Sequence, residues 1–161
     1  MTTGSIGGVL ICTSTVVIID RISKIITRTY LEVGESISVI GNFFCLTHVQ
    51  NSGIAFGINF KGGPVLFTIF AIIAVIGIAI YIWKVRGEHM LKNISLALIL
   101  GGAIGNLLDR FLFGKVTDFL HFSIGRYQWP VFNVADSAVT VGMILFLYYS
   151  FFKVEHINSD T

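Results

Sequence analysis

The sequence predicts an all-α integral membrane protein with four transmembrane helices and one short β-rich segment outside them. Hydrophobic residues make up 54% of the 161 positions, charged residues only 12%, and the mean hydropathy is +0.82. An average soluble domain carries about 25% charged residues. A soluble chain of this length has too small an interior to bury so much apolar surface. We therefore treat residues 1–161 as a single integral membrane domain.

Composition also excludes several classes of function. The net charge is +2, and no run of Lys or Arg could follow the phosphates of a nucleic acid. Cys12 and Cys45 lack the spacing of a metal site or of a redox pair, and the four histidines are scattered. No zinc-protease, phosphate-loop or serine-hydrolase motif is present. We expect neither a metal nor a cofactor.

Four apolar stretches are long enough to cross a bilayer, which needs about 20 residues per helix. We expect the spans at about 6–26, 62–83, 93–113 and 131–152. The second stretch is uninterrupted by charge, the third contains Asp109 and Arg110, and the fourth contains Asp136. Pro130 suits the first position of the fourth helix. The first stretch lacks the basic start and the cleavage site of a signal peptide.

The connection between the first two spans has a different pattern. Residues 36–39 alternate between polar and apolar, and residues 43–49 are rich in aromatic and β-branched side chains. Asn51, Ser52 and Gly53 then form a turn signal. We expect a small sheet within about 35–60, lying on the membrane surface.

The acidic residues gather on one side of the membrane. Successive helices alternate in direction, so Asp20, Asp109 and Asp136 lie at helix ends on the same face, and Asp118 lies in a connection there. An intramembrane Asp costs up to about 3 kcal/mol, so this clustering indicates a functional site. The same face carries seven of the 11 basic residues, which by count alone puts it in the cytoplasm. Several of these bases lie within a helical turn of an Asp and are candidates for pairing.

Two chemistries fit these carboxylates. Asp118 and Asp136 can approach each other, and two close carboxylates share one proton. The ionised member can then take a proton from water, while its neutral partner binds a carbonyl and protonates the leaving amine, as in aspartic peptidases. The alternative is a small carrier or lipid-binding membrane protein in which Asp20, Asp109 and Asp136 relay protons. The residue pattern leaves both open.

The helix ends hold further candidates. Asp20 and Lys24 are spaced i, i+4 with the acid first, the favourable order for an ion pair. Asn106 and Arg110 share a helix face and could orient a substrate. An internal Asp109–Arg110 pair is the structural alternative. Residues 101 and 105 form a GxxxG pattern, whose commonest role is close helix packing.

The chain resembles the lipoprotein signal peptidases (signal peptidase II) along nearly its whole length. The segments that carry the resemblance are Asp20–Lys24, Asn51–Gly57, Gly101–Arg110 with Val116–Phe119, and Phe132–Ser137. The resemblance implies a membrane aspartyl endopeptidase with four transmembrane helices and a small extracytoplasmic β-cradle. Both termini would be cytoplasmic and the active site would lie at the outer surface of the bacterial plasma membrane, against the charge count.

The resemblance also assigns the site residues. Asp118 and Asp136 match the catalytic pair, and Asp20 with Lys24 a structural pair, to which Asp109 adds a structural acid. Residues that line or support the site are Asn51, Gly53, Asn106, Arg110, Asn133 and Ala135. The implied partners are membrane lipid and a diacylglyceryl-modified prolipoprotein, cut just before its lipidated Cys by a globomycin-sensitive monomer. Ile54 and Arg21 depart from the family pattern, where a small residue and Gln are common.

Overall fold

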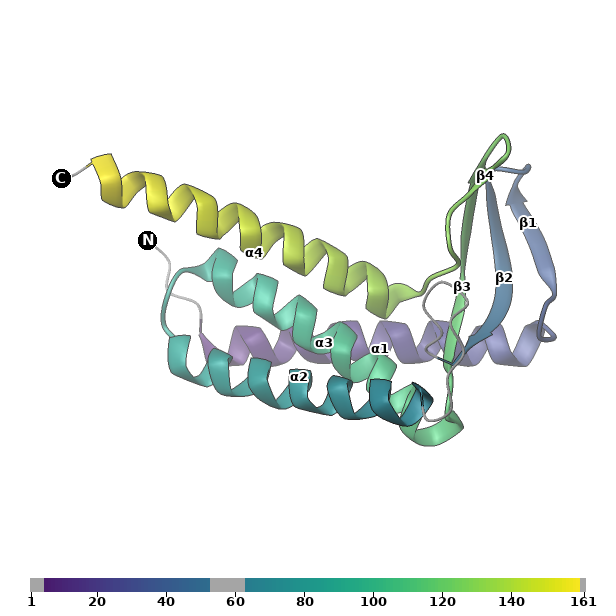
Figure 1. Cartoon of the computed structure of the whole chain (residues 1–161), viewed down its shortest axis with the longest axis horizontal. Coiled ribbons are helices and arrows are strands. Elements are labelled where there is room, and N and C mark those ends of the chain that lie inside the picture. The colour runs from purple at the N-terminus through teal and green to yellow at the C-terminus, as the bar shows by residue number, and fades with distance from the viewer. Residues whose placement is uncertain (1–4, 53–62, 160–161) are drawn as a thin grey trace.

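Four helices form a bundle, and a four-stranded sheet stands across one end of it (Figure 1). The computed structural model describes residues 5–52 and 63–159. The helices are α1 (Ile6–Tyr30), α2 (Gly63–Val85), α3 (Met90–Phe113) and α4 (Val134–Ser159). The start of α1 and the end of α4 lie at the end of the bundle away from the sheet (Figure 1).

Three of the described helices are long and apolar enough to cross a membrane. They are α2 (Val65–Val85), α3 (Met90–Phe113) and α4 (Val134–Phe151). The first expected span, at about 6–26, coincides with α1, whose second half carries charged residues that face α3. The protein is thus mostly helical, with three candidate spans and a small antiparallel sheet.

The sheet draws its strands from two distant parts of the chain. Its order is β1 (Ser36–Ile40), β2 (Phe44–Asn51), β3 (Val116–Ile124) and β4 (Tyr127–Gln128), and all neighbours are antiparallel. The first two strands lie in the expected β-rich segment. The sequence pattern indicates only a connection between spans for the β3–β4 region. This was wrong, because β3 pairs with β2 along most of its length.

The start of the fourth helix also differs from expectation. It begins at Val134, and Pro130 is not at its first position. Phe132 instead exchanges backbone hydrogen bonds with Leu120 of β3, at 2.8 and 3.1 Å. Residues 130–133 therefore follow the sheet before the chain turns into α4, and Asn133 becomes the residue that caps the helix.

Glycines on α3 let the neighbouring helices approach closely. A Cβ at Gly101 would lie 2.8 Å from Cβ of Val16, and one at Gly105 would lie 2.6 Å from a carboxylate oxygen of Asp20. The GxxxG pattern is therefore used inside the bundle, against α1. One residue further along α3, a Cβ at Gly102 would meet the carbonyl oxygen of Ala135 on α4. These contacts make α3 the centre of the bundle.

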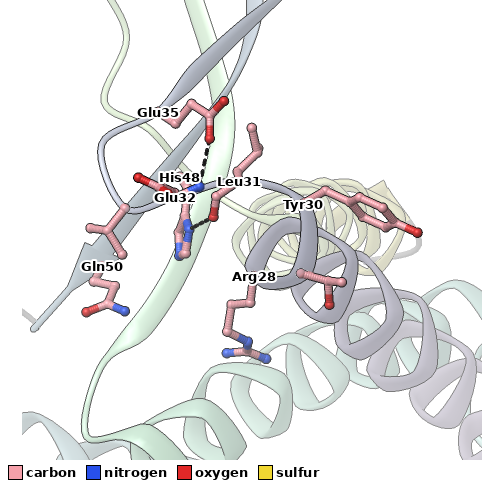
Figure 2. Close-up of a pocket in the computed structure, with 9 residues that line it drawn as sticks. Arg28, Tyr30, Leu31, Glu32, Glu35, His48 and Gln50 are labelled. Atoms are coloured by element: carbon pink, nitrogen blue, oxygen red, sulfur yellow. Dashed lines mark hydrogen bonds between the residues drawn. The ribbon is translucent and has the colours of Figure 1, made fainter.

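The sheet is tied to the end of α1 by His48 of β2. Its Nδ1 donates to the carbonyl oxygen of Leu31 at 2.9 Å, and its backbone amide donates to Glu35 at 2.9 Å (Figure 2). An open pocket of about 990 Å³ lies at this junction, between the last turn of α1 and β2 (Figure 2). Arg28, which lines it, reaches on toward α3 (Figure 2).

Gly102→Ala should lower stability, because the new methyl group has no room beside Ala135 and Val139 of α4. Overpacking of this kind costs about 1–3 kcal/mol. Gly77→Ala in α2 is the matched control, since a Cβ there meets nothing within 4 Å. We expect the apparent Tm in detergent to fall for Gly102→Ala and to stay near wild type for Gly77→Ala. Equal Tm values would contradict the close approach of α3 and α4.

Candidate active site

Asp118 lies on β3 and is held by two amide groups. Its side chain is buried, with the residue 2% exposed. Asn51, at the end of β2, donates from Nδ2 to one carboxylate oxygen at 3.0 Å. Asn133 donates from Nδ2 to the other at 2.6 Å. The pairing of β2 with β3 brings Asn51 alongside, because Val49 is the register partner of Asp118.

Asp136 lies in the first turn of α4, in a reciprocal cap with Asn133. The backbone amide of Asp136 donates to Oδ1 of Asn133 at 2.9 Å, and the amide of Asn133 donates to Oδ2 of Asp136 at 3.2 Å. This is the arrangement of a capping box, in which two side chains satisfy each other's backbone amides. Asn106 of α3 donates from Nδ2 to the remaining oxygen, Oδ1, at 2.7 Å.

Asn133 joins the two carboxylates into one site. It is fully buried, and its side-chain nitrogen bonds Asp118 while its backbone amide bonds Asp136. The same side-chain nitrogen lies 3.1 Å from Oδ1 of Asn106. The structure thus brings together Asp118, Asp136 and three of the four asparagine and arginine side chains expected around them, from β2, β3, α3 and α4.

Burial changes the protonation of Asp118. Burial, and after it repulsion from Asp136, raise the pKa of its carboxyl, while the amides of Asn51 and Asn133 and the charge of Lys24 lower it; the net result is a pKa of about 6. A carboxyl in this state exchanges its proton close to neutral pH. That property suits a group that must be a proton donor in one step and an acceptor in another.

Asp20 and Lys24 of α1 form a buried ion pair next to Ala135, the residue before Asp136. Oδ2 of Asp20 pairs with Nζ of Lys24 at 2.9 Å, and both side chains are buried. The expected i, i+4 pair is therefore present. Oδ1 of Asp20 accepts the backbone amide of Ala135 at 2.9 Å, so this pair also holds the chain beside Asp136. Ala135 itself is fully buried.

Asp109 pairs with α1 and not with its neighbour in sequence. Its Oδ1 lies 2.9 Å from Arg21 and 3.2 Å from Arg28, which confirms that these α1 bases are paired with an acid. Among the ion pairs of the described residues, the alternative Asp109–Arg110 pair is not found. Oδ2 of Asp109 accepts the backbone amide of Thr117 at 2.9 Å.

Arg110 is half-buried and donates to the backbone oxygen of Asn106 at 3.4 Å. Its charge attracts those of Asp136 and Asp118. Gly53, expected to line the site, and Ile54, which departs from the family pattern, lie outside the described residues. Across residues 5–52 and 63–159, no three acidic, His or Cys side chains gather as metal ligands.

Two residues that contact the buried acids are not predicted by the sequence pattern. Arg28 bonds Asp109 and also donates to Oγ1 of Thr117 at 2.9 Å. Its spacing could have identified it, because it follows Lys24 by four residues and so continues the face of α1 that carries Asp20. Thr117 gave no such signal, since its contacts, through the backbone amide and through Oγ1, are with residues of α3 and α1.

Comparison with known proteins identifies the family of the chain. The profile of the family described as "Signal peptidase (SPase) II" matches residues 12–152. A lipoprotein signal peptidase of Desulforapulum autotrophicum is 43% identical over 145 residues, which cover 87% of this chain and 90% of the relative. One of Geobacillus kaustophilus is 45% identical over 137 residues, covering 85% and 88%.

Two solved structures share the fold over nearly the whole chain. One, described as "Bacterial membrane enzyme structure by the in meso method at 2.3 A resolution", has a TM-score of 0.85 and 33% identity, and the match covers 97% of this chain and 95% of that one. A second, solved by the same method at 1.9 Å, has a TM-score of 0.82 and 34% identity, covering 92% and 96%. The profile, the relatives and the fold agree, and the chain belongs to the signal peptidase II family, whose members are proteases that remove signal peptides from prolipoproteins.

Proposed function

We propose that the chain cleaves diacylglyceryl-modified prolipoproteins just before the lipidated Cys, with Asp118 and Asp136 as the catalytic pair. The observation that carries this proposal is the position of Asn133, which hydrogen-bonds both carboxylates from within the bundle. The two groups are thereby held close enough for one to repel the charge of the other. A singly protonated pair is the working state of an aspartic peptidase.

In this mechanism Asp118 carries the proton of the resting pair, because its pKa is raised to about 6. Asp136 takes a proton from a water molecule as the water oxygen attacks the scissile carbonyl carbon. Asp118 hydrogen-bonds the carbonyl oxygen and then gives its proton to the leaving nitrogen as the C–N bond breaks. The pair ends with one proton, now on Asp136, and is ready for another turnover once that proton exchanges.

The surroundings suit a substrate that is held in the bilayer by its lipid. The sheet end of the molecule exposes large aromatic side chains at Phe43, Tyr127 and Trp129. Aromatic residues of this kind favour the membrane–water interface. Phe44 is half-buried, and Phe56 lies outside the described residues. A scissile bond just before a lipidated Cys would lie at headgroup level, within reach of a site at the same depth.

The membrane topology that we propose has four spans. We propose that α1 is the fourth membrane span, because its first half exposes apolar side chains such as Leu10, Ile11 and Ile18. Its charged residues face α3 and are paired there, so they need not contact lipid. Four spans would place both chain ends on the same side of the membrane. As the resemblance to the family implies, we propose that this side is cytoplasmic and that the sheet and the catalytic pair face outward.

Asp118→Asn and Asp136→Asn should each abolish cleavage and leave the protein folded and inserted. Each amide keeps the size of the carboxylate but can neither take a proton from water nor share one. The measurement is a gel-shift assay in detergent with a diacylglyceryl-modified prolipoprotein and its unlipidated twin. We expect wild type to cut only the lipidated form.

The matched control is Glu88→Gln, which removes a carboxylate that pairs with Lys92 in the turn between α2 and α3. This variant should cleave like wild type. Wild-type turnover by either Asp variant would place the chemistry elsewhere. Failure of folded wild type to cut either substrate would overturn the proposed reaction itself.

Activity should fall as pH rises through the pKa of the pair. Below about pH 6 Asp118 keeps its proton, and above it the proton is lost, so kcat/KM should decline on the alkaline side. Asn51→Leu removes an N–H that stabilises the charged form of Asp118. Its loss should move the alkaline limb upward by about one pH unit, since a hydrogen bond to a charged group contributes about 1.5 kcal/mol.

Ser36→Ala serves as the control for this shift, because Ser36 lies on the same sheet and bonds only Thr47 among the described contacts. Its kcat/KM profile should overlay that of wild type. A limb that stays in place in Asn51→Leu, or moves to lower pH, would show that Asn51 does not act on the titrating carboxyl.

A further inference from the structure

Two buried acids outside the catalytic pair make equivalent contacts. Asp109 accepts the backbone amide of Thr117, the residue immediately before Asp118, at 2.9 Å. Asp20 accepts the backbone amide of Ala135, the residue immediately before Asp136, at 2.9 Å. Each catalytic residue is therefore preceded by a peptide group that a buried carboxylate holds in place.

A single cation connects the two acids. Nζ of Lys24 lies 2.9 Å from Oδ2 of Asp20 and 3.5 Å from Oδ2 of Asp109. It also donates to Oδ1 of Asn106 at 2.9 Å. That bond fixes the Asn106 amide with its oxygen toward Lys24, so that its nitrogen points to Asp136. The lysine is 0% exposed, so it does not reach solvent.

Anchoring one helix does not require this arrangement. A buried ion pair adds little net stability over well-packed apolar residues, because desolvation offsets the attraction. The pair Glu88–Lys92 offers a comparison within the same molecule, since it has the same i, i+4 spacing, its nitrogen lies 2.8 Å from oxygen, and Lys92 is buried. The amine of Lys92 pairs with Glu88 and lies over the Tyr81 ring. The amine of Lys24 instead contacts both Asp20 and Asp109.

We propose that Lys24 is a positioning residue for the reaction, which sets the separation of the Asp118 and Asp136 carboxylates through Asp20, Asp109 and Asn106. This inference rests on the proposed catalytic pair. Lys24 itself touches neither substrate nor reacting atoms. Its position decides how far apart Thr117 and Ala135 are held, and with them the two carboxylates that follow.

The inference makes a specific kinetic statement. Without Lys24 the carboxylates of Asp20 and Asp109 repel each other and shift, and the two peptide groups shift with them. A displacement of about 1 Å in a catalytic geometry costs about 100-fold in rate. Substrate binding is unaffected, because Lys24 is buried. The loss therefore falls on kcat and not on KM.

Lys24→Met and Lys92→Met form the matched pair of variants, since both replace a buried lysine of an i, i+4 ion pair. With a diacylglyceryl-modified prolipoprotein as the probe, we expect kcat to fall about 100-fold in Lys24→Met. We expect KM to stay within about threefold of wild type. Lys92→Met should keep both constants within about threefold of wild type, with a comparable drop in Tm.

The pH profile supplies a readout that a purely structural role would not change. The charge of Lys24 lowers the pKa of Asp118, so its removal should move the alkaline limb of kcat/KM to higher pH. Lys92→Met should leave the limb in place. A limb that shifts equally in both variants would contradict the proposal.

A double variant decides the question if Lys24→Met does not fold. Asp20→Leu with Lys24→Met replaces the pair by apolar side chains, a change that is often neutral or stabilising for buried ion pairs. A merely structural pair would then leave turnover intact, as in the control Glu88→Leu with Lys92→Met. We expect a folded protein whose kcat remains about 100-fold low.

The outcomes are distinct. Wild type that fails to cut the lipidated substrate would remove the proposed function. Wild type that cuts, with kcat of the Lys24 variants within about threefold of the Lys92 controls, would overturn the positioning role alone. A raised KM at unchanged kcat would also overturn it, because it would place Lys24 in substrate binding.

Discussion

The structure depends on pairing buried charges between α1 and α3. Arg21, Lys24 and Arg28 face two carboxylates, Asp20 on their own helix and Asp109 on α3. Charged groups placed in an apolar environment must be paired and hydrogen-bonded, or they are too costly to keep. Gly105 supplies the necessary space, since any side chain there would displace the Asp20 carboxylate. The close packing of α1 against α3 is therefore also what places the buried charges beside the site.

Much of this could be read from the sequence, because the signals are local. Apolar length located the helices to within a few residues at most ends, and helix direction placed Asp20, Asp109, Asp118 and Asp136 on one side. The contacts that link them bear out that clustering. The i, i+4 spacing of Asp20 and Lys24 gave their ion pair directly.

What the sequence did not reveal depends on partners far away in the chain. β3 forms a strand because it pairs with β2. The local sequence between the third and fourth helices does not indicate which segment it pairs with. Pro130 alone suggests that the fourth helix starts there. The β-bridge between Phe132 and Leu120 keeps the chain extended, so α4 begins only at Val134. Any residue at position 117 could donate the amide that Asp109 accepts, and the bond from Arg28 to the Thr117 hydroxyl joins residues 89 positions apart.

Hydrogen bonds between distant parts of the chain also bear on when the site is complete. Asn51 meets Asp118 across a separation of 67 residues, and Ala135 meets Asp20 across 115. Contacts that close such long loops form late, after the intervening helices are in place. A nascent chain that has inserted only its first three helices lacks Asp136 altogether. If Asp136 is catalytic, as proposed, a partly synthesised chain cannot cleave substrate before α4 has joined the bundle.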